Sequence, residues 1–254
     1  MPVDHRNDRP IYAQIADELR SRIKSGEYGP GAKLPSEAEL AGAHGVTRVT
    51  VRRALAVLAA EGRTESIKGR GVFVREVPPV MRMGNNRFSR EARRRGLGAF
   101  AAEAERLGLA SGQEDLEIVT VDSPLEVAEV LGEPRSVVKR RRMILAGVPT
   151  QLADSYVPLS IADKIGYGRG ATAPGGTYGL LELHGHEITK FREQISIRSA
   201  DPEEAIALEL PLAAPVAVLV RIAYDQAGRA VEYFDSVAAG DKHIYVYEFD
   251  APKD

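Results

Sequence analysis

Apolar side chains recur every four residues near the start of the chain, at Ile11, Ile15, Leu19 and Ile23. This period predicts a helix of roughly 15 residues that buries one stripe of its surface. The helix is expected to end near Gly26, because glycine often follows the last periodic residue of a helix. The chain therefore begins with one amphipathic helix.

Two further helices are predicted in the next 40 or so residues. Ser36 and Glu39 have the spacing of a capping box, in which each side chain bonds the backbone N–H of the other residue, so a short helix is expected there. A third helix is expected from a Thr47 cap to a stop at Gly62. Its inward face would consist of Val51, Leu55 and Leu58.

A β-hairpin is predicted directly after the third helix. Residues 64–67 and 72–74 have the composition of short strands, and Lys68-Gly-Arg-Gly71 would form the turn between them. Its glycines allow close approach to a groove wall, and its two cations suit phosphates or a minor groove. Three helices followed by such a hairpin indicate a winged helix-turn-helix, which is a DNA-binding module.

The third helix carries side chains suited to DNA. Arg48 and Arg52 are four residues apart and share one face, and an arginine can hold guanine O6 and N7 with two hydrogen bonds. Arg53 and Lys68 are assigned to phosphates. Taken alone, the two arginines could also form an ordinary solvated face of the third helix. The β-hairpin that follows favours the DNA-binding interpretation. The expected DNA-binding residues are Ser36, Thr47, Arg48, Thr50, Arg52, Arg53, Lys68, Gly69, Arg70 and Gly71.

Charge is divided unevenly along the 254 residues. Residues 1–80 hold 13 Lys/Arg against 10 Asp/Glu, residues 81–96 hold 6 against 1, and residues 97–254 hold 15 against 25. A basic beginning and an acidic remainder are expected if only the first part meets phosphates. We therefore predict a DNA-binding domain at 1–76, a basic linker at 77–96 and a larger domain at 97–254. The linker arginines are either solvated or in contact with DNA phosphates.

Composition excludes several other classes of function. The chain has no cysteine, so disulfides, thiolate nucleophiles and cysteine-based zinc sites are excluded. The first ten residues have no apolar core of a signal peptide, and no run of about 18 apolar residues is present. We expect a cytoplasmic protein that uses no cofactor and no metal ion and does not contact the membrane.

The larger domain contains a repeat. Each copy reads as a helix with proline at its start followed by a β-hairpin, at residues 123–157 and 201–237. Pro124 precedes Pro202 by 78 residues, and Arg142 precedes Arg221 by 79. Two such copies predict an antiparallel sheet of pseudo-symmetric halves with helices on one side, which is an α+β domain.

Four consecutive cations, Lys139 to Arg142, lie in one predicted strand of the first copy. Alternation places Arg140 and Arg142 on one face of the strand, and Lys139 and Arg141 on the other. Because buried cations need partners, either carboxylates or an anionic ligand would meet the inward pair, unless the strand is a charge-protected edge. Pro174-Gly-Gly-Thr-Tyr178 would place N–H groups and a hydroxyl at a helix start, which suits an anion.

Residues 9–75 resemble the DNA-binding domain of the GntR family of bacterial transcription regulators. The resemblance is carried by Pro10-Ile-Tyr-x-Gln-Ile, Gly31-x-x-Leu-Pro-Ser-Glu, Val46-Thr-Arg-x-Thr-Val-Arg and Gly69-Arg-Gly. It implies that Arg48 and Arg52 face DNA and that the wing-tip glycine lies close to the duplex. The chain has Ala38 where the family usually has arginine and Val72 where it usually has threonine, so no family operator sequence is carried over.

Residues 87–249 resemble the UTRA effector-binding domain of HutC-type GntR regulators, whose fold is similar to chorismate lyase. The arginine-rich strand, the Gly-Gly-Thr-Tyr helix start, Phe191-Arg-Glu, Pro202-Glu-Glu-Ala and Asp225-x-x-Gly with Val231-Glu-Tyr carry this resemblance. It implies a dimerising domain with a pocket for a small, often anionic metabolite. Glu193, Arg198 and Glu232 would either recognise polar groups of a ligand or pair with the arginines. The expected effector-binding residues are Arg140, Arg142, Ser155, Thr177, Tyr178, Glu193, Arg198 and Glu232.

The predicted architecture is a multi-domain α/β protein, with an N-terminal winged helix-turn-helix and a C-terminal α+β, antiparallel-sheet UTRA domain. We expect a repressor that binds a double-stranded, inverted-repeat operator as a homodimer and is released by a small-molecule effector, for which an anion is one option. One alternative is a constitutive dimeric regulator whose C-terminal domain only dimerises. The other is an enzyme with a DNA-binding head. The chain lacks a phosphate-loop glycine motif and a His-x-x-x-His pair, so no enzymatic activity is expected.

Overall fold

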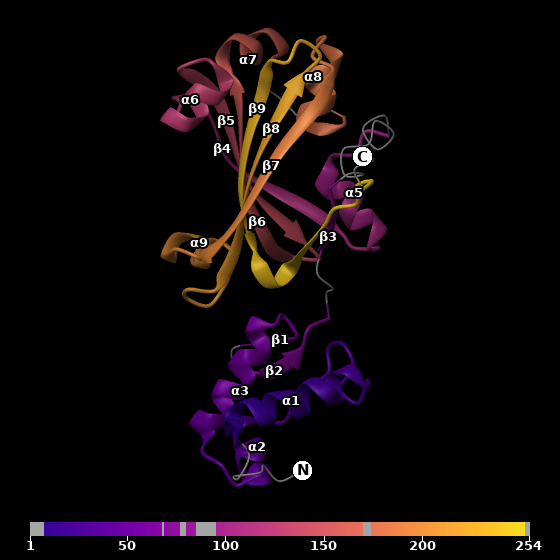
Figure 1. Cartoon of the computed structure of the whole chain (residues 1–254), viewed down its shortest axis with the longest axis vertical. Coiled ribbons are helices and arrows are strands. Elements are labelled where there is room, and N and C mark those ends of the chain that lie inside the picture. The colour runs from indigo at the N-terminus through magenta and orange to yellow at the C-terminus, as the bar shows by residue number, and fades with distance from the viewer. Residues whose placement is uncertain (1–7, 68, 77–79, 85–94, 170–173, 252–254) are drawn as a thin grey trace. The chain divides into compact units, whose positions relative to one another are not determined.

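The computed structural model describes residues 8–251 except for 68, 77–79, 85–94 and 170–173. The chain divides into two compact units, Met1–Pro78 and Pro79–Asp254 (Figure 1). Most of the predicted linker, 77–96, lies outside the described residues. Its described residues 80–83 form a strand that belongs to the second unit.

The first unit is the predicted winged helix-turn-helix. It consists of α1 (Ile11–Lys24), α2 (Glu37–His44), α3 (Arg48–Ala60) and the antiparallel hairpin of β1 (Thr64–Ile67) and β2 (Gly71–Val74). The apolar stripe of α1 packs on the inward face of α3, which follows from the three- and four-residue spacing of the apolar residues in the two helices. The buried core residues are Ile15, Ala16, Leu19, Leu34, Leu40, Val51, Ala54, Leu55, Leu58 and Val74.

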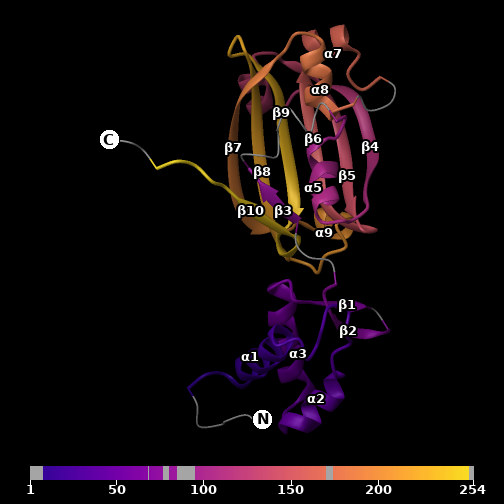
Figure 2. The ribbon, with the colours of Figure 1, turned by 90° about the vertical axis from the view of Figure 1, so that its right-hand side faces the viewer.

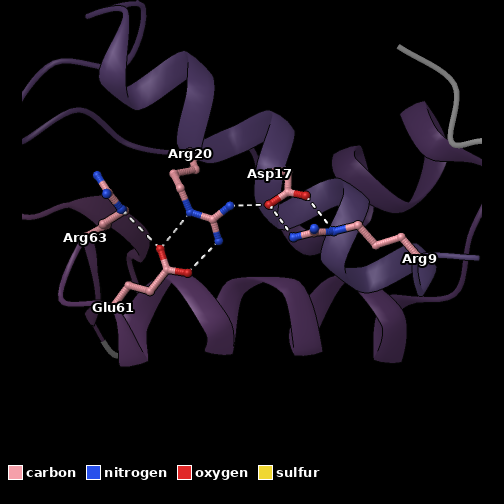
Figure 3. A network of polar contacts seen from close by, with 5 residues as sticks. All are labelled: Arg9, Asp17, Arg20, Glu61 and Arg63. Atoms are coloured by element: carbon pink, nitrogen blue, oxygen red, sulfur yellow. Dashed lines mark hydrogen bonds and ion pairs between the residues drawn. The ribbon is translucent and has the colours of Figure 1, made fainter.

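A network of ion pairs connects α1 to the end of α3 (Figure 3). Nε of Arg20 donates to Oε2 of Glu61 over 2.8 Å, and the same guanidinium also pairs with Asp17. Arg9 approaches Asp17 to 2.8 Å and Arg63 approaches Glu61 to 3.1 Å. The hydrogen bond from Arg20 keeps the pKa of Glu61 below its usual range. The network therefore holds two helices together by charge as well as by their apolar contact.

Glu61→Gln is expected to lower the free energy of unfolding of the first unit by about 0.5 kcal/mol at pH 7, because the pairs are partly exposed to water. Because the pKa of Glu61 is lowered in the folded protein, its ion pairs contribute their full stability above the unfolded pKa of about 4.3. This stability is lost as pH falls through the pKa of the folded protein. The difference between the two proteins should therefore vanish in acid. Urea unfolding at several pH values measures it, with Glu65→Gln, an exposed carboxylate of β1, as the control. An effect of Glu61→Gln that persists below about pH 3 would contradict the electrostatic explanation.

The second unit is built on one antiparallel sheet with the strand order β4-β5-β6-β9-β8-β7. Along the chain, β4, α6, β5 and β6 form one half, and β7, α9, β8 and β9 form the other, which confirms the predicted repeat. The halves meet between β6 and β9, where Asp154 is opposite Asp235. The bounds are β4 (Ser111–Asp122), α6 (Leu125–Leu131), β5 (Arg135–Leu145), β6 (Val148–Pro158), β7 (Ile188–Ser199), α9 (Pro202–Ala207), β8 (Pro215–Asp225) and β9 (Ala230–Ala239).

Helices cover both faces of this sheet. The helices of the repeat, α6 and α9, pack on one face, as predicted, where Val127 and Leu131 of α6 contact Tyr156 and Tyr233. The other face carries α7 (Leu159–Ile165) and α8 (Gly176–Leu183), and α5 (Ala99–Arg106) lies alongside them (Figure 2). The prediction of helices on one side was wrong for the whole domain, since it considered only the repeated helices.

A short parallel ribbon completes the second unit. It joins β3 (Val80–Met83) to β10 (His243–Val246), which follows the single-turn helix η1 (Gly240–Lys242). The buried side chain of Arg82 hydrogen-bonds Gln151 of β6 and so ties the ribbon to the sheet. Among the described residues, none of the helices is both long and apolar enough to cross a membrane.

Asp235→Asn is expected to raise the free energy of unfolding of the second unit at pH 7. Burial, together with the facing charge of Asp154, raises the pKa of Asp235, and its Oδ1 accepts no hydrogen bond. Because the pKa of Asp235 is raised in the folded protein, its protonated form stabilises the fold fully below the unfolded pKa of about 3.9. This stabilisation is lost as pH rises through the pKa of the folded protein. Denaturant unfolding between pH 3 and 8 should show a flatter profile for Asp235→Asn than for Glu129→Gln, an exposed control on α6. Two parallel profiles would contradict the expectation.

Candidate functional sites

Half of the predicted DNA-binding residues lie on α3 or cap it. Thr47 caps the helix, with its Oγ1 accepting the N–H of Thr50 over 3.3 Å, and the two hydroxyls lie 3.1 Å apart. Arg48, Arg52 and Arg53 are all exposed, whereas the buried residues of α3 belong to the core that it shares with α1. The first half of α3 thus carries three exposed cations, and the start of a helix also favours phosphates.

Glu37 of α2 holds Arg52 in place. Nε and Nη2 of Arg52 donate to the two carboxylate oxygens of Glu37 over 3.0 and 2.8 Å. These hydrogen bonds keep the pKa of Glu37 below its usual range, while the Arg52 side chain stays 68% exposed. Sequence analysis missed Glu37, although it directly follows the capping Ser36 and precedes the arginine helix. The fork restricts the Arg52 side chain without removing it from the surface.

Ser36 caps the start of α2. Its Oγ accepts the N–H of Glu39 over 3.2 Å and donates to Oε2 of Glu39 over 2.7 Å, and that carboxylate also accepts the N–H of Ser36. The predicted capping box is therefore confirmed. The hydroxyl that was expected at the DNA is occupied by this box in the free protein.

The tip of the hairpin is compatible with close approach to DNA. Gly69 and Gly71 have φ angles of +75° and +119°, which favour glycine. The guanidinium carbon of Arg70 lies 5.5 Å from the centre of the Phe73 ring, so the cation is held by its neighbour while remaining exposed. A Cβ at Gly71 would lie 2.9 Å from Cε of Lys33. Lys68, also predicted to bind DNA, lies outside the described residues.

A cavity of about 990 Å³ lies on the α7–α8 face of the sheet. Residues of β4, β5, β6, β8 and β9 line it from the sheet, and residues from α5, α7 and α8 and their loops line it from the other side. Among its described lining residues, five are cations and only Glu232 is acidic. The cations are Arg95, Lys139, Arg141, Arg169 and Arg221. The cavity therefore favours an anionic occupant.

Four of the predicted effector residues line this cavity, namely Ser155, Thr177, Tyr178 and Glu232. The other four, which are Glu193 and three arginines, do not. Arg140 pairs with Glu117 and with Asp154 on the opposite face of the sheet, Arg142 pairs with Glu114, and Arg198 forms a double bridge to Glu204 of α9 over 2.6 Å.

The inward pair of the cationic strand is Lys139 and Arg141 instead. Both are lining residues, and Arg141 donates to Oγ of Ser155 on the neighbouring strand. The predicted alternation is correct, but the cavity lies on the face of Lys139 and Arg141, not on the face of Arg140 and Arg142 that was expected to bind the effector. The reason is that carboxylates of β4 and β6 satisfy Arg140 and Arg142 on the α6 side.

Arg221 is a cavity residue that sequence analysis missed. Its side chain is 4% exposed, and its guanidinium carbon lies 4.3 Å from the centre of the Phe234 ring. Burial alone would lower its pKa, but Tyr178, Glu232 and Glu193 raise it, so the group stays charged. Glu193, predicted to touch the ligand, is not a lining residue and accepts from Nη1 of Arg221 over 3.2 Å.

The register of the strands reveals why Arg221 was missed. Arg140 is opposite Asp154 in the first half, and Val220 is opposite Asp235 in the second. Because Asp154 and Asp235 are equivalent, Arg141 is the structural counterpart of Arg221. The sequence alignment paired Arg142 with Arg221, one residue away. Had the strands been aligned without that slip, the repeat itself would have indicated both cavity arginines.

Among the described lining residues, three buried polar atoms have no hydrogen-bond partner. They are Oε2 of Glu232, Nε of Arg141 and Nε2 of Gln151. The hydroxyl of Tyr178 accepts from Nε of Arg221 over 2.9 Å and hydrogen-bonds Glu232, and burial raises the pKa of this tyrosine well above its usual range. Burial likewise raises the pKa of the neighbouring Tyr167 to about 12, so both tyrosines are neutral. The lining residues thus include one acceptor atom and two donor atoms without partners.

The start of α8 forms one side of the cavity. Gly175 and Gly176 have φ angles of +79° and +70°, and both line the cavity together with Thr177. A Cβ at Gly179 would lie 2.3 Å from the carbonyl oxygen of Pro174, so glycine is required where the chain turns into the helix. The predicted helix start is therefore at the cavity, with its first N–H groups free of helical partners.

Comparison with known proteins is consistent across the two units. Residues 11–74 match the model of bacterial regulatory proteins of the gntR family, and residues 106–244 match the UTRA domain. The chain is 32% identical to the HTH-type transcriptional repressor NagR of Bacillus subtilis, over 98% of this chain and 99% of that protein. It is 30% identical to an uncharacterized HTH-type transcriptional regulator of Streptomyces coelicolor, over 96% and 94%. The crystal structure of PhnF from Mycobacterium smegmatis has the same fold, with a TM-score of 0.60 at 24% identity over 94% of this chain and 100% of that one.

Proposed function

Because the chain belongs to the GntR family of bacterial transcription regulators and carries the UTRA domain of its HutC-type members, we propose that it is a homodimeric repressor released from an inverted-repeat operator by an anionic effector. Its relatives are DNA-binding regulators rather than enzymes, and the UTRA domain binds small-molecule effectors. The Bacillus subtilis relative is a transcriptional repressor, which supports repression over activation. A protein with this task acts in the cytoplasm, where the bacterial chromosome lies.

The DNA contacts are proposed as follows. Arg48 and Arg52 reach base edges, because they extend from the first two turns of the recognition helix, which is where such helices meet the major groove. Arg53 and the hairpin tip contact phosphates, which fixes the register of the protein on the duplex. Two copies related by a two-fold axis would read two half-sites of an inverted repeat.

The cation-rich cavity is the observation that supports an anionic effector. Lys139 and Arg141 lie side by side along one strand and would hold an anionic group such as a carboxylate or phosphate. The unpartnered Oε2 of Glu232 would accept a hydrogen bond from a hydroxyl or ammonium group of the same effector. We infer that the effector is a small polar anion that also carries a hydrogen-bond donor.

Footprinting of the purified protein on DNA flanking its gene, with and without metabolite pools, tests this proposal. A protected inverted repeat that one pool releases supports an effector-controlled repressor. Protection that no pool changes would favour the constitutive dimeric regulator. Gel filtration with light scattering would show independently whether the protein is a dimer.

Arg141→Met is expected to keep operator affinity and to require at least about tenfold more of the active pool for release, because a charged hydrogen bond to the effector is lost. Arg140→Met is the matched control, since Arg140 is the next residue of the same strand and faces away from the cavity. The release curve measured by fluorescence anisotropy on the protected DNA gives both values. Equal release of the two variants would place the effector elsewhere.

A further inference from the structure

Val49 is an exposed apolar residue on a surface that is otherwise cationic and polar. Its side chain is 61% exposed, and in the described part of the first unit it is the only large apolar side chain with high exposure. It belongs neither to the buried core of that unit nor to the apolar residues packed against this core. A β-branched residue also has no advantage in an exposed helical turn. The fold therefore gives no reason for valine at this position.

The neighbours of Val49 are the residues that face DNA. At about 100° per residue, Val49 lies about 60° from Arg52 and about 40° from Arg53 around the α3 axis, one residue after Arg48. It lies in the first turn of the helix, and the start of a recognition helix is the part that reaches base edges. Ala56 is the exposed residue two turns further along this face and is too small to block its approach to DNA.

The major groove has one apolar feature that such a side chain can recognise. Thymine carries a C5-methyl group there, and the other three bases present mainly hydrogen-bonding atoms at their edges. An isopropyl group held between arginines matches a methyl group that lies beside a guanine or a phosphate. We propose that Val49 reads the C5-methyl group of a thymine in the operator and is therefore a determinant of sequence specificity.

Selection of binding sites from a fully randomised duplex library by the full-length protein tests this assignment. The unaltered protein should prefer thymine at a position that loses this preference in Val49→Ala, while the preferences at all other positions persist. Arg53→Ala is the control and should weaken binding without changing any base preference. Circular dichroism checks that Val49→Ala is folded, which is expected because the side chain packs on no core residue.

Exchange of that thymine for deoxyuridine removes only the methyl group. Affinity of the unaltered protein should fall by about three- to fivefold, the effect of one buried methyl group, and affinity of Val49→Ala should not change. A 5-methylcytosine at the same position should bind better than cytosine. The assignment is overturned if Val49→Ala keeps every base preference, or if deoxyuridine weakens both proteins equally. Failure of the library to yield any preferred sequence would instead count against sequence-specific DNA binding itself.

Discussion

Arg221→Met is expected to destabilise the second unit by about 3–5 kcal/mol, the cost of leaving buried charges without their partner. The guanidinium of Arg221 is buried between Glu193 and the Tyr178–Glu232 pair, and these groups together hold its pKa above the usual value. Methionine fills a similar volume but cannot donate a hydrogen bond. The two glutamates would then have to take up protons or draw water into the sheet face.

Denaturant unfolding of the full chain measures this loss, and a second substitution tests its cause. Arg221→Met combined with Glu232→Gln should recover part of the stability, because one uncompensated charge is removed together with its partner. Arg192→Met, an exposed arginine on the adjacent strand β7, should change the free energy of unfolding by less than about 0.5 kcal/mol. If the double substitution were no more stable than Arg221→Met, the loss would come from packing rather than from charge.

Arg52→Ala is expected to lower affinity for the operator by about 5- to 150-fold, the range for loss of a bidentate contact to a base. Affinity for random duplex DNA should fall less, since Arg52 would read sequence and not only phosphate charge. One part of the loss has another origin. Without Arg52, the carboxylate of Glu37 stays at the DNA-facing surface with no cation paired to it.

The double variant Arg52→Ala/Glu37→Ala separates the two effects. It should recover affinity for random DNA, because the repulsion between Glu37 and phosphates is removed, but it should not recover preference for the operator. Fluorescence anisotropy at several salt concentrations measures both affinities. An equal loss of affinity for operator and random DNA in Arg52→Ala would contradict base reading and would show that Arg52 contacts only phosphates.

Much of the first unit could be predicted because its signals are local. The four-residue period of Ile15 and Leu19, the capping box at Ser36 and the Thr47 cap all act within a few residues, and each lies where it was expected. The Glu37–Arg52 fork could not be read in the same way. It depends on how α2 and α3 cross, which no spacing within either helix specifies.

The second unit illustrates a different limit. The sequence determined the repeat, the antiparallel hairpins and the alternation of the four cations from Lys139 to Arg142, because strand geometry makes neighbouring side chains point to opposite faces. Which face became the cavity wall depended on α8 covering one side and on Glu114, Glu117 and Asp154 supplying carboxylates on the other. Sheet register, which pairs Arg141 with Ala153 and Arg221 with Phe234, made Arg141 and Arg221 equivalent.

The sequence by itself therefore determined the elements of the first unit, the repeated elements of the second and the arginines of α3, because backbone periodicity and capping are short-range properties of the chain. Only the tertiary structure decided which charged side chains line the cavity and which form ion pairs on the opposite, α6 face of the sheet. The physical reason is that a buried charge is placed by its partners, and here those partners come from strands and helices distant in sequence.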